Sequence, residues 1–224
     1  AYTVFVQRNI FPQREDFDFT TAVHQDRVHI GGATSYAKWV PLSDCPLEKG
    51  PLAVASGSHR AGVLETRVGQ GAGAMEIRVP IPGTWVCGPF ATGDVLVFSD
   101  TTVHQALPNR SAELRQSFDA RYQPATQPIA ECNMTPYAGN GTWEQVHATW
   151  ESSRDQYYWR ELEPNVVPFE TSYYERRDAM AFEMGEHGDV TARDALLRIV
   201  QRDANSAKRT RAERLLARLE VAAQ

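Results

Sequence analysis

The sequence lacks the features that would place the protein in a membrane or on nucleic acid. Its longest apolar runs are the length of a strand, whereas a transmembrane helix needs about 20 apolar residues. The formal net charge is −5, so there is no basic surplus of the kind that nucleic-acid-binding proteins carry. We therefore predict no nucleic-acid partner and no membrane partner.

Cysteine is scarce as well. Cys45, Cys87 and Cys132 are odd in number, widely spaced and free of any CxxC pair, which argues against a disulfide framework. We expect these thiols to be buried or inert in a reducing compartment. Residues 1–23 also lack the charged start, the long apolar run and the cleavage site of a signal peptide, so the predicted location is cytoplasmic.

What is present suits one substantial core, since 42% of the 224 residues are apolar. In the first 125 residues, short segments rich in β-branched and aromatic side chains alternate with turns of Gly and Pro. This pattern is typical of a mainly β sandwich or barrel. The predicted strands lie in residues 2–10, 33–42, 75–81, 94–98 and 114–122.

The character of the chain changes after residue 125. We expect residues 1–125 to form the β core and residues 126–224 to form a loop and helical extension packed on it. Residues 143–160 could form a helix with Thr142 as its N-cap.

Residues 191–221 have the apolar stripe of a helix, which Asn205 and Ser206 should interrupt. Thr191 with Asp194 resembles a capping box at the start of this stretch. Basic residues outnumber acidic ones here. Two interpretations stand side by side: a solvated helical hairpin packed on the core, or a surface for an anionic partner or a subunit contact that would make a homo-oligomer.

The residues that carry chemistry begin with His24 and Asp26. Side chains alternate across a strand, so positions i and i+2 present an imidazole and a carboxylate side by side. These two groups and a second, distant histidine would make the facial triad of non-haem iron(II) enzymes, which leaves metal positions open. A His-x-Asp tripeptide alone is weak, because it occurs by chance on surface strands. His104, six residues after a buried apolar run, is the candidate third ligand.

A polar stripe follows His104. Arg115, Ser117, Asp119 and Arg121 share one face of the strand predicted at 114–122. Such a stripe is costly in a dry core and makes sense if it lines a wet cavity. The planar fork of an arginine grips a carboxylate with two bonds, and a neighbouring hydroxyl adds a third. Arg121 could take this role instead of Arg115, and Arg115 could pair with Asp119 structurally.

Taken together, these segments resemble the phytanoyl-CoA dioxygenase-like family of Fe(II)/2-oxoglutarate-dependent oxygenases. The resemblance covers roughly residues 4–124. Its specificity comes from the order and spacing of the motifs. They are 23–26 (VHQD), 39–42 (WVPL) with Cys45, 50–54 (GPLAV), 56–59 (SGSH), 93–98 (GDVLVF), His104, 109–111 (NRS), Arg115 and 121–122 (RY).

The resemblance implies a double-stranded β-helix, a cupin-like jelly roll, here with additional C-terminal helices. It implies that iron(II) is held by His24, Asp26 and His104. It also implies that 2-oxoglutarate is held by Arg115 with Ser117, with a further contact from Gln7. Dioxygen would be consumed and a small-molecule substrate hydroxylated.

Two details of the sequence bear on this implied function. Asp26 is intact, whereas halogenating relatives replace this carboxylate, so hydroxylation is favoured. Relatives carry a much longer segment before the His-x-Asp motif, so we expect the N-terminal part of the family domain to be missing.

Substrate contacts are predicted at Trp39, Arg121 and His29, with alternatives for each. Trp39 could be cavity wall or core, and His29 could be an ordinary hydrogen-bonded or solvent-facing histidine. His59, in a Ser-Gly-Ser-His turn, is interpreted as structural. Two other functions remain open: a non-catalytic jelly-roll binding protein, and a cupin-type isomerase or hydrolase that uses zinc or manganese.

Overall fold

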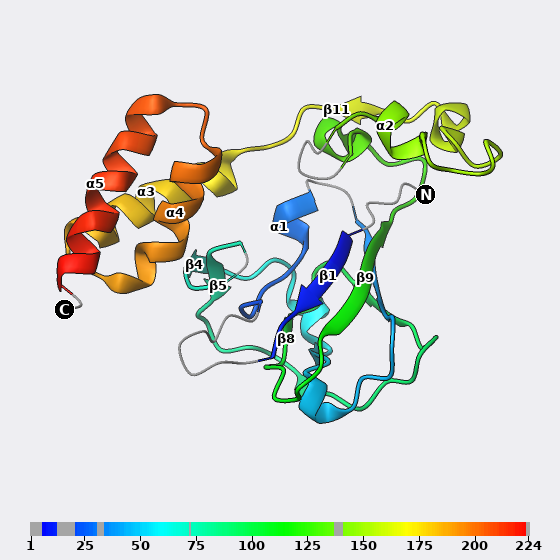
Figure 1. Ribbon diagram of the computed structural model, residues 1–224, viewed down its shortest axis with the longest axis horizontal. Helices are drawn as coiled ribbons and strands as arrows, with labels where there is room; N and C mark the ends of the chain where they lie inside the picture. The colour runs from blue at the N-terminus through cyan, green and yellow to red at the C-terminus, as the bar shows by residue number, and fades with distance from the viewer. Residues whose placement is uncertain (1–5, 13–20, 31–33, 72, 137–140, 223–224) are drawn as a thin grey trace.

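The larger of the two main sheets has four strands in the order β1-β9-β2-β7, and every neighbouring pair is antiparallel. The computed structural model describes residues 6–12, 21–30, 34–71, 73–136 and 141–222, and it shows a β body beside a lobe of helices (Figure 1). The strands of this sheet are β1 (Val6–Ile10), β2 (Tyr36–Pro41), β7 (Leu96–Ser99) and β9 (Arg115–Tyr122).

The second sheet has the order β6-β3-β8 and is also antiparallel. Its strands are β3 (Leu52–Ser56), β6 (Thr84–Val86) and β8 (His104–Ala106). His24 forms an antiparallel bridge with His104 at the outer edge of β8. A separate hairpin joins β4 (Thr66–Val68) to β5 (Met75–Ile77).

Apolar side chains from both sheets pack against one another. Trp39 of β2 packs with Leu52 of β3 and Ala106 of β8, and Phe98 of β7 covers the same cluster. Exposure alternates along β2, as expected for a strand with one face on a core. The prediction of a mainly β body is therefore confirmed in its coarse form, as antiparallel sheets accompanied by helices.

The predicted strands agree with the structure at most positions. The segments 33–42 and 114–122 contain β2 and β9, the segment 2–10 contains β1, and the segment 94–98 overlaps β7 but ends one residue before it. The strand predicted at 75–81 is too long, because β5 ends at Ile77.

The segment with His24 and Asp26 differs more from its prediction. It forms no regular strand beyond the bridge at His24, and helix α1 (Arg27–Ile30) begins directly after Asp26. The Asp26 carbonyl oxygen accepts a hydrogen bond from the His29 N–H, at 2.9 Å. The chain therefore turns into the helix directly after the second predicted ligand, Asp26.

After β9 the chain forms a short parallel pair of strands, β10 (Ile129–Ala130) and β11 (Val166–Val167), with helix α2 (Trp143–His147) between them. The capping prediction is confirmed, since Thr142 and Gln145 form a reciprocal capping box. The helix predicted over 143–160 is wrong beyond His147. A separate 3₁₀ turn, Tyr158–Leu162, follows, and Tyr157 before it has a φ of 56°, which no helix residue adopts.

Three helices form the C-terminal lobe: α3 (Ser172–Glu186), α4 (Arg193–Arg202) and α5 (Ser206–Ala222). The predicted break near Asn205 is confirmed. The predicted capping box of Thr191 and Asp194 is wrong. The Thr191 N–H donates to the Asp189 carboxylate, and the Asp194 carboxylate accepts from the Gly71 N–H.

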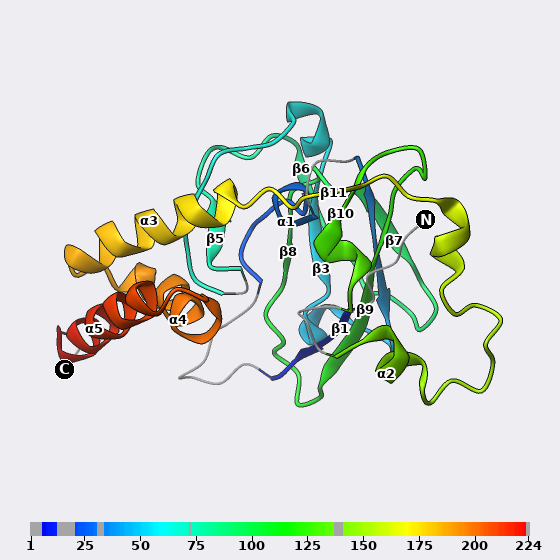
Figure 2. The ribbon, with the colours of Figure 1, turned by 90° about the horizontal axis from the view of Figure 1, so that it is seen from above.

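The helical lobe has its own apolar core, which extends onto the β4–β5 hairpin. Leu196, Ile199 and Leu215 are fully buried in it, and Val68 and Met75 of the hairpin belong to the same cluster. Figures 1 and 2 show the three helices on one side of the β body, away from α2 and β11. The lobe is therefore attached through the hairpin. The division into a core of 1–125 and an extension stays a prediction.

The three cysteines are predicted to be buried or inert. All three are free; Cys45 is buried, and Cys87 and Cys132 are exposed. Burial raises the pKa of each thiol above its usual value, which agrees with the expectation of low reactivity. Within the described part of the chain, no helix combines the length and the apolar character that crossing a bilayer requires.

Neighbouring leucines on α4 offer a test of the helical lobe. Leu196 is fully buried and Leu197 is 37% exposed. We expect Leu196→Ala to lower the free energy of unfolding by about 2–5 kcal/mol, because it leaves a cavity. Leu197→Ala should change it by less than about 0.5 kcal/mol. Urea unfolding followed by circular dichroism measures both, and equal losses would contradict the packing described here.

Candidate metal centre

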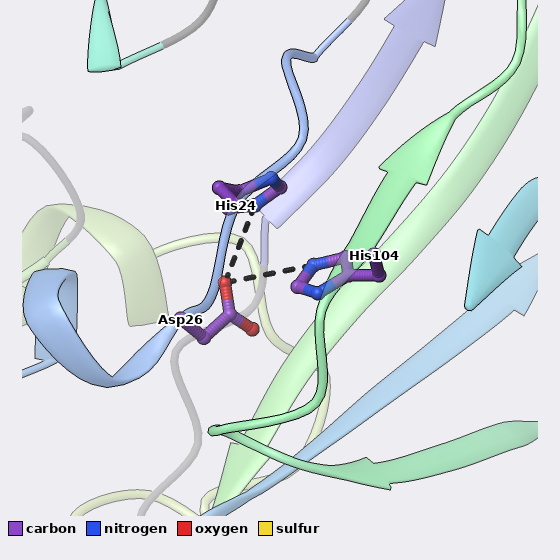
Figure 3. Close-up of side chains that lie close together, drawn as sticks. All are labelled: His24, Asp26 and His104. Carbon is purple, nitrogen blue, oxygen red and sulfur yellow. Dashed lines mark ion pairs between the residues drawn. The ribbon is translucent and has the colours of Figure 1, made fainter. Parts of the chain in front are cut away.

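Three side chains from two distant segments meet at the edge of the smaller sheet (Figure 3). His24 and Asp26 precede α1, and His104 is the first residue of β8. One ligand atom from each lies within 4.8 Å of the others. Oδ1 of Asp26 is 3.6 Å from Nε2 of His24 and 3.8 Å from Nε2 of His104. The structure thus brings together the three predicted ligands.

Backbone carbonyl groups determine which ring nitrogen of each histidine is available. Nδ1 of His24 is 2.7 Å from the Ala22 carbonyl oxygen, and Nδ1 of His104 is 3.0 Å from that of Thr102. A carbonyl oxygen can only accept, so each Nδ1 carries the proton and donates. In the neutral form of each ring, Nε2 then carries the lone pair, and both Nε2 atoms lie near the same carboxylate oxygen. Such outer hydrogen bonds are what orient histidine ligands in metal sites.

Burial and charge set the protonation of this group. Burial, together with the neighbouring His24, lowers the pKa of His104 to about 3. Burial alone would raise the pKa of Asp26, but Arg121, His104 and His24 together outweigh it and hold that pKa well below its usual range. His104 is therefore neutral and Asp26 ionised at neutral pH, which are the forms that bind metal.

The residue between the two ligands points away from them, into the protein. Gln25 is 1% exposed, and its amide donates to the carbonyl oxygens of Thr101 at 2.6 Å and Gly62 at 2.8 Å. Its own oxygen accepts from the Leu64 N–H at 2.8 Å. All hydrogen-bonding groups of this side chain are engaged, so it attaches the ligand segment to the loops on either side.

A partly buried ion pair continues the same attachment. Arg27 donates to both carboxylate oxygens of Asp100, at 2.6 and 2.9 Å, and the Arg27 N–H donates to the Asp100 carbonyl. Asp100 is fully buried and also accepts from the N–H and the hydroxyl of Ser35. Two-pronged arginine–carboxylate pairs are geometrically specific. The pair therefore secures the chain after Asp26 to the chain just before His104.

Both sheets line a cavity that is open to solvent and contains the three ligands; the space in it and at its mouth is about 470 Å³. Arg115, Ser117, Asp119 and Arg121 all line it, so the predicted polar stripe of β9 faces the cavity. The other lining residues are Ile10, Thr21, Ala37, Lys38, Trp39, Leu52, Phe98 and Ala106.

Neighbouring side chains hold Arg115 in the wall of this cavity. It is 2% exposed, its guanidinium donates to the Ser117 hydroxyl at 3.4 Å, and it lies 5.5 Å from the centre of the Trp39 ring. An arginine over an aromatic face is held in plane, with its donors directed sideways. Trp39 is 2% exposed and packs edge-on against Phe90, so it is both cavity wall and core.

Arg121 lies at the metal end of the stripe. Its Nη2 is 2.7 Å from Oδ2 of Asp26. The sequence predicts a substrate contact here, or an alternative anchor for a carboxylate. The structure shows instead that its nearest charged partner is the candidate metal ligand.

Three other histidine and glutamine candidates are His29, His59 and Gln7; His29 and His59 are not among the described lining residues. His29 packs edge-on against Tyr173, and burial lowers its pKa to about 4. His59 is exposed in the 3₁₀ turn Ser58–Ala61, in agreement with a structural turn. The backbone of Gln7 pairs with Phe118 in the β1–β9 register, and its side chain lies outside the described residues.

Sequence reasoning missed Lys38 as a lining residue and Gln25, Arg27 and Asp100 as supports. A signal existed for Gln25 and Arg27, because side chains that flank the ligands by one position point to the opposite face. No local signal pairs Arg27 with Asp100, which is far away in the sequence.

Comparison with known proteins gives curated relatives that match about half of this chain. The 1-deoxypentalenic acid 11-beta-hydroxylase of Streptomyces arenae is 30% identical over 138 residues, which are 56% of this chain and 49% of the relative. Its counterpart from Streptomyces exfoliatus is 34% identical over 131 residues, 53% of this chain and 46% of the relative. The chain therefore spans about half the length of the curated relatives it matches.

Similar solved structures include the epimerase SnoN in complex with Fe3+, alpha ketoglutarate and nogalamycin RO. It is 25% identical, with a TM-score of 0.49, and the match covers 63% of this chain and 58% of that one. Residues 3–117, just over half of the chain, match the family model described as phytanoyl-CoA dioxygenase (PhyH). The chain belongs to the phytanoyl-CoA dioxygenase family.

Proposed function

We propose that this chain carries the active site of an Fe(II)- and 2-oxoglutarate-dependent dioxygenase. The reaction would hydroxylate an unactivated C–H bond of a small molecule, with dioxygen consumed and succinate and carbon dioxide released. The observation that carries the proposal is the shared cavity. His24, Asp26 and His104 converge in it, and the buried Arg115 with Ser117 lines it as well. Membership of the family supports the same function.

The three ligands fit iron(II). Two neutral imidazoles and one carboxylate are the donors of the open iron sites that activate dioxygen. Oδ1 of Asp26 lies near both Nε2 lone pairs, so one ion could contact all three atoms after small adjustments. Iron(II) with 2-oxoglutarate would supply the oxidising chemistry, and the chain would supply orientation and a site protected from bulk water.

Arg115 and Ser117 suit the distal carboxylate of 2-oxoglutarate. Both are buried in the cavity wall, and Ser117 is 2 positions along β9, on the same face. A planar guanidinium and a hydroxyl together offer three donors to one carboxylate. A further contact from Gln7 stays a prediction.

We propose a double-stranded β-helix for the β body. The order β1-β9-β2-β7 in one sheet supports it. In the other sheet, the His24 segment, β8, β3 and β6 follow one another, again four elements. Two antiparallel sheets that enclose a cavity between them are the general form of a jelly roll. Residues 1–125 would be the catalytic core and residues 126–224 the loop and helical extension.

For the substrate we propose a small natural-product-like metabolite. The curated relatives are named for hydroxylation of 1-deoxypentalenic acid, so this acid is the first compound to test. Apolar lining at Leu52 and Phe98 and the wall formed by Trp39 suit a largely hydrocarbon body. The contacts predicted at Arg121 and His29 have less support, because Arg121 is engaged by Asp26 and His29 lies outside the cavity lining. Cytoplasmic location and a homo-oligomer through the helices stay predictions.

Anaerobic titration with iron(II) and 2-oxoglutarate tests the metal centre. We expect the wild type to show the visible charge-transfer band of a 2-oxoglutarate–iron(II) chelate. His104→Ala should abolish it, because one ligand is lost. His59→Ala is the matched control, since His59 is exposed and outside the ligand group, and it should keep the band.

Two outcomes would contradict the proposal in different ways. Iron binding without the band would exclude 2-oxoglutarate as the co-substrate. A cupin-type metal-dependent isomerase or hydrolase would then be the favoured function. Loss of the band in His59→Ala, with the band kept in His104→Ala, would mean that the ligand set is wrong.

The co-substrate anchor has its own test. Arg115→Gln should raise the Kd for 2-oxoglutarate about ten- to a hundredfold, because a charged hydrogen bond contributes about 1.5–3 kcal/mol. Ser117→Ala should raise it less. Arg60→Gln removes the same charge at an exposed position and should leave the Kd unchanged. Calorimetry on the metal-loaded protein measures all three, and a wild-type Kd in Arg115→Gln would exclude this arginine as the anchor.

A further inference from the structure

The contact between Arg121 and Asp26 joins the two sheets at the metal centre. Arg121 lies in β9 of the larger sheet, where its backbone pairs with Ala37 of β2. Its Nη1 donates to the Ala120 carbonyl oxygen at 3.1 Å, and its Nη2 reaches Asp26 at 2.7 Å. Asp26 belongs to the segment that adds to the edge of the smaller sheet. The Arg121 guanidinium, held by a regular strand, therefore contacts the Asp26 carboxylate, which lies in an irregular segment.

The two oxygens of Asp26 have different neighbours. Oδ1 lies 3.6 and 3.8 Å from the Nε2 atoms of His24 and His104. Oδ2 lies beside Arg121, and it is buried with no hydrogen bond of acceptable angle among the described residues, so the contact is an ion pair. Figure 3 shows Oδ1 turned toward both imidazoles, with Oδ2 turned away. One oxygen is thus presented to the metal position and the other to the arginine.

We propose that Arg121 is a positioning residue that holds the Asp26 carboxylate with Oδ1 toward the two histidines. The inference rests on the metal centre proposed above and adds a residue that the ligand set alone does not include. Partners that hydrogen-bond or pair with a ligating carboxylate orient it, and their loss weakens metal affinity by about ten- to a hundredfold.

Arg121 rather than Arg115 has this role because of its place on the strand. The two arginines share one face of β9 but stand six residues apart, roughly 20 Å along an extended strand at about 3.3 Å per residue. Arg115 meets Ser117 and Trp39, and Arg121 meets Asp26. The same side chain therefore occurs twice in one cavity with two different partners.

Titration with cobalt(II) alone, at fixed pH and without 2-oxoglutarate, tests the inference without any turnover. Cobalt(II) affinity reports the strength of the site, and its visible ligand-field spectrum reports the arrangement of the ligands. We expect Arg121→Gln to bind cobalt(II) about tenfold more weakly than the wild type, with a changed spectrum. Arg121→Lys keeps the charge but loses the planar fork, and should lose less affinity.

Lys38→Gln is the control for the removal of a positive charge from the cavity lining, because Lys38 lines the cavity and lies outside the ligand group. Its cobalt(II) affinity and spectrum should match those of the wild type. Thermal unfolding of each metal-free variant shows whether it is folded. Should Arg121→Gln prove unfolded, Arg121→Lys decides alone, and wild-type affinity with a wild-type spectrum in that variant would overturn the inference.

The results separate the two levels of proposal. A wild type that does not bind cobalt(II) overturns the metal centre and this inference with it. A wild type that binds, beside an Arg121→Gln that binds as tightly or more tightly with the same spectrum, overturns only the role of Arg121. Tighter binding by Arg121→Gln would mean that the arginine acts merely as a like charge that repels the metal.

Discussion

The antiparallel bridge between His24 and His104 is the contact on which the rest of the site depends. It consists of two backbone hydrogen bonds of 3.0 Å, and within residues 21–30 no regular strand extends it on the His24 side. Such a short pairing would be weakly held by itself. Gln25 and the ion pair of Arg27 with Asp100 attach the ligand segment more firmly to the chain before His104. Asp100 is fully buried, so removal of Arg27 would leave a buried carboxylate without its charged partner.

Where a local period determines position, the sequence was enough to predict the site. The side-chain period of a strand is two, so the facing of Arg115, Ser117 and Arg121 toward one cavity could be predicted from their spacing along β9. The same alternation placed His24 and Asp26 together, although the strand itself is only a bridge. The contact of His104 with His24 leaves no mark in the local pattern. His104 could be proposed only from its place after a buried apolar run and from the order of the motifs.

Contacts between distant positions explain what the sequence could not predict. Asp100 as the partner of Arg27, and Asp26 as the partner of Arg121, follow from the way the two sheets meet. A charged residue in a sequence has many possible partners, and only the fold selects one. The end of α2 at His147 has a similar cause: residues 143–160 contain enough helix-forming residues for a longer helix, but tertiary contacts of the aromatic cluster around His147 override propensity.

The division of Asp26 between a metal position and an arginine solves a problem of the protein before any metal is bound. A buried carboxylate without a partner is costly and would tend to take up a proton, which is the wrong form for a ligand. Arg121 supplies the opposite charge from the larger sheet, and it does so through Oδ2, so Oδ1 stays available beside the two Nε2 atoms. A counter-ion on Oδ1 would have competed with the metal for the same atom. The arginine therefore stabilises the folded, metal-free site in the geometry that the metal needs, and the cost of arranging the ligands falls on folding and not on binding.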